Sequence, residues 1–234
     1  MTEGDGMLLK LMRYLNRKKT VVEFASLASL EPVSRAFGLD RGTPINRYYI
    51  DKFLAGHAGL IHGRVLEVGG SDYTRRFGGD RVARREVLHA VPGNPAATLI
   101  GDLADPATLP ADAFDCFICT QTFDCIFAVQ QAVQGAHRLL RPGGVLLATL
   151  SGLGQISRYD LERWGEYWRF TTASAARLFE PVFTGGVEVG SCGNLPAAIA
   201  ALQGLAVEDL PDPALLDVHD ADYPLVVTVA ACKA

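Results

Sequence analysis

The chain has 234 residues, of which 49% are hydrophobic and 21% charged, and its formal net charge is -4. This length accommodates one α/β domain with additional helices, and the composition is that of an ordinary globular protein. The net negative charge gives no general attraction to nucleic acid or to an anionic membrane. No apolar run approaches the length of a membrane-spanning helix, and the five cysteines do not indicate a disulfide framework.

The first sixty residues are expected to be mainly helical. Apolar residues recur at helical spacing over residues 7–14 and 21–30. Pro44 then opens a third helix, because proline suits the first helical position and apolar residues follow three to four apart. We interpret residues 1–60 as a helical cap and residues 61–234 as the main domain, with which the cap forms a single globular unit.

Segments of strand character alternate with segments of helical periodicity in the rest of the chain. The alternation predicts crossover connections and a parallel sheet, and near-continuous apolar runs predict strands buried on both faces. The expected strands are 65–68, 82–88, 97–100, 114–119 and 145–150, with two late strands at 187–189 and 225–231. The expected helices are 127–140, 174–179 and about 197–205.

The first expected strand ends in an acid and a turn of small residues. Glu67 belongs to an apolar run, where a carboxylate is costly to bury without a donor. Gly69, Gly70 and Ser71 allow a sharp bend and the close approach of a ligand. This order predicts a pocket for a nucleoside-like ligand. The turn matches neither the dinucleotide fingerprint nor a phosphate-binding loop, since no Gly-Lys-Ser or Gly-Lys-Thr follows.

Further features of the same kind follow in order along the chain. They are Asp102 and Leu103 after the third strand, the Phe114-Asp115 opening of the fourth, Gln121 and Thr122 at its end, and the Arg-Pro-Gly-Gly turn 141–144 before the fifth. Together they resemble the class I S-adenosylmethionine-dependent methyltransferases of type 11, the small-molecule branch, over about residues 60–150. The resemblance implies a Rossmann-like, doubly wound, mostly parallel sheet with an antiparallel last strand, an N-terminal helical extension and an insertion after the fifth strand. It also implies S-adenosylmethionine as the cofactor.

The resemblance assigns the turn after the first strand to the methionine part of the cofactor. Gly69, Gly70 and Ser71 would pass under it, and Glu67 would fix the turn or meet the amino group. A simple turn-capping carboxylate is the alternative for Glu67. The turn departs from the family, which has more glycines where this chain has Ser71 and Tyr73.

The resemblance also assigns the later strand ends. Asp102 would accept from the adenine amino group, with the Leu103 backbone beside the ring, and Gln121 and Thr122 would line the pocket near the sulfonium. His89 stands where the family usually has a ribose-binding acid, and a neutral imidazole can accept one hydroxyl proton. A helix N-cap is the alternative for Asp102, and an ordinary loop histidine is the alternative for His89.

The resemblance also assigns the helix after Pro44 a role in cofactor binding. In related methyltransferases such a leading helix closes over the cofactor, so Tyr48 or Tyr49 would pack on it and Arg47 would meet its carboxylate. The alternative is that these tyrosines pack against the sheet.

The insertion after the fifth strand, residues 155–170, mixes aromatic and charged side chains. It follows a strand's carboxyl end, where ligands of open sheets bind, so it predicts an acceptor pocket with Tyr159 and Asp160 as candidate catalytic residues. The alternative is a small satellite core, to which Trp168 and Phe170 are assigned.

Other motifs carry less chemistry. Cys116 and Cys119 have C-x-x-C spacing, but on a strand they face opposite sides, so we expect neither a redox pair nor a metal site. The N-terminus lacks a signal-peptide pattern, and we expect a cytoplasmic protein.

These features predict a methyltransferase that acts on an oxygen or nitrogen of a small molecule, such as a natural product, a sugar or a modified peptide. A small-molecule or peptide acceptor is the expected partner, with no nucleic acid and no membrane, and the oligomeric state is left open. A non-catalytic binding domain of the same fold is the alternative. A nucleic-acid methyltransferase is disfavoured by the acidic charge and by Thr120–Phe123, which lacks an Asn/Asp-Pro-Pro-Tyr type of motif.

Overall fold

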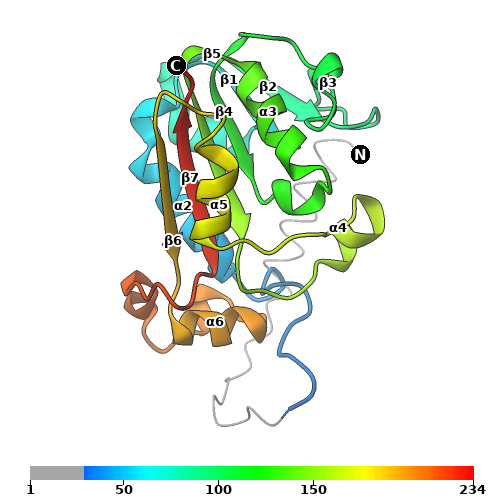
Figure 1. Ribbon diagram of the computed structural model, residues 1–234. Coiled ribbons are helices and arrows are strands. Elements are labelled where there is room, and N and C mark those ends of the chain that lie inside the picture. The colour runs from blue at the N-terminus through cyan, green and yellow to red at the C-terminus, as the bar shows by residue number, and fades with distance from the viewer. Residues whose placement is uncertain (1–28) are drawn as a thin grey trace. The chain divides into compact units, whose positions relative to one another are not determined.

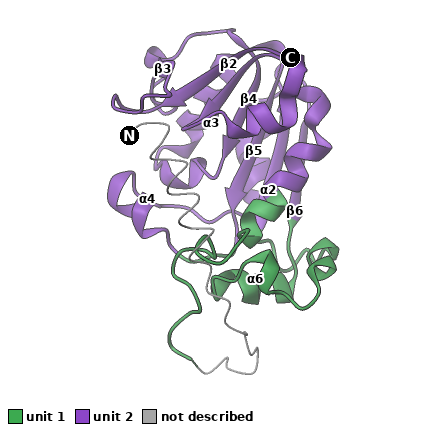
Figure 2. Cartoon of the chain, turned by 180° about the vertical axis from the view of Figure 1, so that it is seen from behind, with its two compact units in different colours: residues 1–49, 153–155, 192–225 green, residues 50–152, 156–191, 226–234 purple. Residues whose placement is uncertain are grey.

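The computed structural model of the chain describes residues 29–234. The expected helix over 7–14 lies outside these residues, and the one over 21–30 reaches them only at its last two positions, which are not helical. The chain divides into two compact units, shown in Figure 2. Unit 1 contains residues up to 49, 153–155 and 192–225, and unit 2 contains 50–152, 156–191 and 226–234. The expected boundary between a cap and a main domain at residue 60 stays a prediction.

Seven strands of the described chain form one sheet with the order β3-β2-β1-β4-β5-β7-β6 (Figure 1). Neighbouring strands from β3 to β5 are parallel, whereas β7 runs antiparallel to β5. The strands are β1 (Gly63–Val68), β2 (Val82–His89), β3 (Leu99–Ile100), β4 (Phe114–Thr120), β5 (Leu140–Ser151), β6 (Val187–Cys192) and β7 (Val226–Cys232). The structure confirms the expected Rossmann-like, mostly parallel sheet with an antiparallel last strand.

Three of the described α-helices, among them α5 (Thr172–Phe179) and α6 (Leu195–Leu202), begin at a residue whose side chain caps the helix. The Thr171 hydroxyl accepts from the Ser174 N–H in a capping box, and the Asn194 side chain accepts from the Ala197 N–H. The first of these caps opens α5 and the second opens α6, which also has Pro196 in its first turn. The α-helices of the described chain are α2 (Ile45–Gly56), α3 (Val129–Leu139), α4 (Arg158–Arg163), α5 (Thr172–Phe179) and α6 (Leu195–Leu202).

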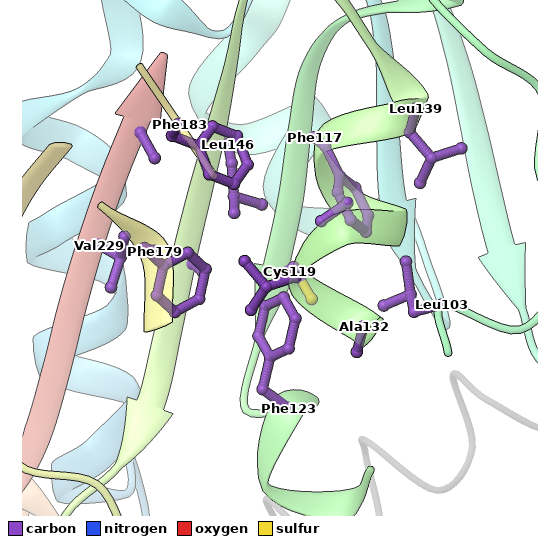
Figure 3. Packing of buried hydrophobic residues seen from close by; sticks show 14 of the residues in the cluster. Leu103, Phe117, Cys119, Phe123, Ala132, Leu139, Leu146, Phe179, Phe183 and Val229 are labelled. Carbon is purple, nitrogen blue, oxygen red and sulfur yellow. The ribbon is translucent and has the colours of Figure 1, made fainter. Parts of the chain in front are cut away.

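The sheet of unit 2 is buried on both faces. On one face α3 and α5 pack on the strands, and Figure 3 shows Phe117 and Cys119 of β4 among the side chains of this cluster. On the other face Ile50 and Leu54 of α2 pack with Ile118 of β4. Burial on both sides explains why the sequence of β4 is apolar almost throughout.

The two cysteines of β4 lie on opposite faces of the sheet, as the strand period predicts. Cys116 belongs to the cluster beneath α2 and Cys119 to the cluster beneath α3, and both thiols are free and fully buried. Burial raises the pKa of the Cys116 thiol to about 12. The thiols are therefore protonated core groups.

The Arg-Pro-Gly-Gly turn lies within β5, which begins at Leu140 rather than at Val145. Gly143 has a φ of 77°, and the pairing of β4 with β5 shifts register beside this turn. A Cβ at Gly144 would come within 2.9 Å of the Phe114 carbonyl oxygen, so only glycine permits the close approach of the two strands there.

Lys233, next to the C-terminus, forms hydrogen bonds at the C-terminal end of α3. Its Nζ donates to the carbonyl oxygens of Leu140 at 2.8 Å and His137 at 3.1 Å, and it pairs with Asp112 at 2.7 Å. The lysine thus adds to the backbone bond from the Leu140 N–H to the His137 carbonyl at the end of α3.

Replacing this lysine should destabilise the protein moderately. Lys233→Met keeps the aliphatic length but removes the donor, and we expect the free energy of unfolding in urea to fall by about 1–2 kcal/mol. Arg158→Met, at an exposed cation, is the control and should change it by less than about 0.5 kcal/mol. Equal losses in the two variants would contradict the capping role.

Unit 1 is held by a buried ion pair. The Arg41 guanidinium donates from Nε to Asp209 Oδ2 at 2.6 Å and from a terminal nitrogen to Oδ1 at 2.8 Å, and the Arg41 side chain is 2% exposed. The guanidinium lowers the pKa of the Asp209 carboxyl against the opposing effect of burial. The pair joins two segments that lie far apart in the sequence.

Candidate functional site

The carboxyl ends of the central parallel strands form one edge of the sheet in unit 2. Val68 of β1 pairs with Leu88 of β2, and Leu88 pairs with Leu99 of β3. On the other side, Glu67 of β1 pairs with Ile118 of β4. The residues that follow these positions therefore meet at this edge, where open α/β sheets bind their ligands.

Glu67 fixes the turn that follows β1. Its carboxylate accepts from the N–H of Tyr73 at 3.2 Å, and from the N–H and the hydroxyl of Thr74, both at 2.7 Å. The side chain is 4% exposed, and burial raises the pKa of the Glu67 carboxyl although the three donors oppose the shift. These bonds show that Glu67 fixes the turn, and a contact of its carboxylate with the cofactor's amino group stays a prediction.

The backbone at Gly69 and Gly70 is open. Gly69 has a φ of 76°, its N–H donates to the Leu88 carbonyl at 2.9 Å, and its carbonyl accepts from the Asn94 side chain at 2.9 Å. A Cβ at Gly69 or Gly70 would meet no heavy atom within 4 Å. Ser71 continues the turn and accepts from the Arg75 N–H through its carbonyl. The turn is therefore fixed by hydrogen bonds while part of its backbone stays accessible.

His89, the last residue of β2, has a defined hydrogen-bonding state. Its Nδ1 lies 2.7 Å from the Val91 carbonyl oxygen, which can only accept, so Nδ1 carries the hydrogen. In the neutral ring Nε2 is then an acceptor. The imidazole also makes an edge contact with Trp164, with ring centroids 5.5 Å apart. The sequence reasoning did not select Trp164, and its only signal was its place in the aromatic segment after β5.

Asp102 lies at the carboxyl end of β3. Its Oδ1 accepts from the Ala104 N–H at 2.8 Å in a local turn, and its own N–H donates to the Thr108 hydroxyl. Asp102 is not a helix N-cap, because the helical turn that follows is capped by Asp105. Among the described residues, Oδ2 has no hydrogen-bonding partner. Leu103 is buried in the core, so its side chain anchors this loop. One oxygen of Asp102 is thus structural and the other is open to a ligand.

Gln121 and Thr122 follow β4. Gln121 has a φ of 47°, in the left-handed region, and its N–H donates to the Thr149 carbonyl at 2.8 Å. Its amide oxygen accepts from the Ser151 hydroxyl at 2.6 Å, and Nε2 donates to the Thr149 hydroxyl at 3.3 Å. The Thr122 hydroxyl donates to the Thr120 carbonyl. Strained backbone of this kind persists only where surrounding contacts hold it.

Asp124 is a buried acid beside Gln121 that the sequence reasoning missed. Its Oδ1 accepts from the Ser151 N–H at 2.8 Å, and Oδ2 lies 3.1 Å from the Ser151 hydroxyl. Its carbonyl accepts from the N–H of Tyr167 at 2.8 Å. The side chain is 2% exposed, and burial raises the pKa of the Asp124 carboxyl to about 6. The available signal was an acid within the otherwise apolar run 123–128.

The raised pKa of Asp124 makes stability depend on pH. Its folded-state pKa is above the unfolded value, so its contribution is complete below about pH 4 and is lost as the pH rises through about 6. Relative to Asp124→Asn, the wild type should lose about 2–3 kcal/mol of unfolding free energy between pH 4 and pH 8. Urea unfolding of both proteins across this range measures it. A constant difference would contradict the shift.

The candidate catalytic residues lie in α4. The Tyr159 ring is exposed and lies under the Arg163 guanidinium, 3.6 Å from the ring centroid. The Asp160 N–H donates to the Ser157 hydroxyl, which caps the helix. Among the described residues, the Asp160 carboxylate makes no hydrogen bond and no ion pair. Its oxygens are therefore not committed to holding the structure.

The rest of this segment presents aromatic rings to solvent. The ring of Phe127 stacks on Trp168 with centroids 5.8 Å apart and meets the edge of Tyr167 at 5.4 Å. Trp168 is 36% exposed, so its assignment to a satellite core is wrong, whereas Phe170 is buried as expected. The Trp168 indole donates to the Ile126 carbonyl, which holds the ring at the surface instead of inside.

Tyr48 belongs to unit 1. Its hydroxyl donates to Asp217 at 2.6 Å, and its ring makes an edge contact with Tyr49. Tyr49 is buried, and burial raises the pKa of its phenol. A contact between Tyr48 and a bound cofactor stays a prediction.

The described residues offer neither a metal site nor a membrane span. Within residues 29–234, no three His, Cys, Asp or Glu side chains are grouped so that they could hold a metal ion. The same residues contain no helix with the length and apolar character needed to cross a membrane.

Comparison with known proteins identifies the domain around this edge. A family model described as a methyltransferase domain matches residues 57–148, which include every candidate cofactor residue from Glu67 to Thr122. No curated protein matches the chain.

Solved structures of S-adenosylmethionine-dependent methyltransferases share the fold. One from Thermotoga maritima, described as a possible histamine N-methyltransferase, is 15% identical with a TM-score of 0.51, over 81% of this chain and 92% of that one. One from Mesorhizobium loti is 14% identical with a TM-score of 0.51, over 81% and 98%. One from Archaeoglobus fulgidus is 10% identical with a TM-score of 0.51, over 80% and 94%. At these identities the likeness shows the fold alone.

The family match supports a methyltransferase domain over residues 57–148, and the fold is the one found in solved S-adenosylmethionine-dependent methyltransferases. The match also supports S-adenosylmethionine as the cofactor. The residues of the sheet edge suit such a ligand, because the open backbone at Gly69 and Gly70 leaves room for it and Asp102 Oδ2 accepts no hydrogen bond from residues 29–234.

Proposed function

We propose that the protein transfers a methyl group from S-adenosylmethionine to an oxygen or nitrogen atom of a small molecule, such as a natural product, a sugar or a modified peptide. The observation that carries this proposal is the sheet edge itself. Open glycine backbone at Gly69 and Gly70 and an unoccupied carboxylate oxygen at Asp102 lie within the matched methyltransferase domain.

In this proposal the donor lies along the carboxyl ends of β1, β2 and β3. Gly69, Gly70 and Ser71 pass beneath its methionine part. His89 Nε2 accepts from a ribose hydroxyl, and Asp102 Oδ2 accepts from the adenine amino group, with the Leu103 backbone beside the ring. Each contact pairs a donor of the ligand with an acceptor that the fold leaves available.

The donor, when bound, supplies a methyl group already activated by the positive sulfonium. The chain then has to hold an acceptor atom close to that methyl and in line with the leaving sulfur. Gln121 and Thr122 line this position in the proposal. Asp160 accepts a proton from acceptors that must lose one, and Tyr159 orients the acceptor beside it. The unengaged carboxylate of Asp160 supports its role.

Exposed aromatic rings support the proposed binding of a small-molecule acceptor. Phe127, Tyr167 and Trp168 form an exposed aromatic face that a flat or ring-shaped acceptor can cover. The net charge of -4 opposes nucleic acid as the substrate, so we propose a small-molecule or peptide acceptor in the cytoplasm.

Calorimetry with S-adenosylmethionine and S-adenosylhomocysteine tests the cofactor, and a labelled methyl group followed into panels of alcohols, amines, sugars and peptides tests the acceptor. We expect heat of binding for both ligands and label in one class of acceptor. No heat and no thermal shift at millimolar ligand would falsify the proposal.

A non-catalytic binding domain is the second candidate. His89 favours it, because it replaces the acid that related enzymes use at this strand end. Binding of both ligands without label transfer to any acceptor, in a protein whose Asp160→Asn variant binds equally well, would support this candidate.

A further inference from the structure

Three side chains form a hydrogen-bonded chain at the ends of β4 and β5. The Ser151 hydroxyl lies 2.6 Å from the amide oxygen of Gln121 and 3.1 Å from Oδ2 of Asp124. The Ser151 N–H donates to Oδ1 of Asp124 at 2.8 Å, which holds serine and carboxyl together. The chain runs from a buried acid to a side chain at the edge of the sheet.

The hydroxyl of Ser151 cannot serve both neighbours when Asp124 is ionised. It has one hydrogen, whereas the Gln121 amide oxygen and the Asp124 carboxylate both need a donor. When Asp124 is protonated, its own O–H can donate to Ser151 Oγ, and the serine hydrogen is then available to Gln121. In this state each acceptor of the chain has a donor while Gln121 Nε2 donates to Thr149.

Gln121 depends on such contacts for its position. Its φ of 47° is in the left-handed region, which costs a non-glycine residue about 1 kcal/mol or more. The backbone bond to Thr149 holds the residue, and the amide contacts set the direction of the side chain. Loss of the Ser151 hydrogen bond therefore frees the Gln121 amide to turn.

We propose that Asp124 is a positioning residue, which acts through the Ser151 hydroxyl to hold the Gln121 amide against the methyl donor. This inference rests on the proposed function, since it gives Gln121 a ligand to meet. It goes beyond it by assigning a role to a residue that does not itself reach the ligand.

The groups that face Asp124 allow its protonation to be followed. Arg169 and Glu166 come from the segment after α4 and act on Asp124 in opposite directions, and they pair with each other. Cys119 of β4 and Cys125 beside it are the neighbouring thiols, and burial raises the pKa of both. The thiols stay protonated between pH 5 and pH 8, whereas the Asp124 carboxyl, with a pKa of about 6, titrates there.

Calorimetric titration with S-adenosylhomocysteine from pH 5 to pH 8 tests the inference, because this probe lacks the sulfonium charge that would attract an ionised Asp124 directly. The wild-type Kd should rise about 5-fold as the pH passes through about 6. Asp124→Asn should remove this rise and keep the low-pH affinity, since its amide donates to Ser151 as the protonated carboxyl does. Ser151→Ala should bind weakly at every pH. Glu180→Gln, at an exposed acid of α5's C-terminal end, should keep the wild-type profile.

The outcomes separate the two proposals. A wild type that binds with a Kd independent of pH, or an Asp124→Asn variant that keeps the wild-type pH profile, overturns the positioning role. A lower melting temperature in Asp124→Asn with the pH profile intact assigns Asp124 to structure alone. A wild type that binds no S-adenosylhomocysteine at any pH overturns the proposed function instead.

Discussion

Gly69→Val should weaken the binding of S-adenosylhomocysteine at least 100-fold, which corresponds to about 2.7 kcal/mol or more. The side chain would stand in the open space above the turn, where the proposed donor lies, and the φ of 76° is strained for any residue with a Cβ. Calorimetry measures the change in Kd.

Gly79→Val provides a matched control for this substitution. Gly79 also has a positive φ, of 55°, and a Cβ there would likewise meet no heavy atom within 4 Å. It lies in the short helical turn before β2, outside the proposed donor contacts. We expect a comparable loss of stability and an unchanged Kd. If the two variants lose affinity equally, backbone strain and not occupation of the turn explains the result.

Glu67→Ala should have the largest effect on stability. It leaves the N–H groups of Tyr73 and Thr74 and the Thr74 hydroxyl without their acceptor in a buried setting. We expect the free energy of unfolding to fall by about 3–4 kcal/mol. The donor affinity should fall about 10-fold with it, because the glycine turn loses its anchor.

Urea unfolding and calorimetry together check this expectation. Glu188→Ala removes an exposed acid from β6 and should change neither quantity. If Glu67→Ala binds S-adenosylhomocysteine as tightly as the wild type does, then the turn does not need its carboxylate to stay in place.

The positions of several candidate cofactor residues along the sheet could be predicted from local sequence. Glu67, Asp102 and Gln121 were placed in or just after the last residues of apolar runs, and the parallel sheet brings the ends of those strands to one edge. The C-x-x-C pair was separated correctly by the strand period alone. Such predictions need only the period of an element and the place where it ends.

Contacts between distant segments were not predictable in this way. The bond between Asp124 and Ser151, the contact of His89 with Trp164 and the capping of α3 by Lys233 each join residues whose spacing carries no signal. Trp168 was wrongly assigned to a buried core for the same reason, because the contact that holds it at the surface joins separate segments. An aromatic residue is usually buried, but here the indole donates to the Ile126 carbonyl at the surface.

The sequence by itself determined the alternation of strands and helices and the small-residue turn after β1, because periodicity and glycine act over a few residues. It also marked the acids and amides at the strand ends. Only the tertiary structure decided that both oxygens of Glu67 accept from the turn after β1, whereas among the described residues only one oxygen of Asp102 accepts a hydrogen bond. Hydrogen-bond partners are chosen by packing in three dimensions, and a carboxylate's partners decide whether it can meet a ligand.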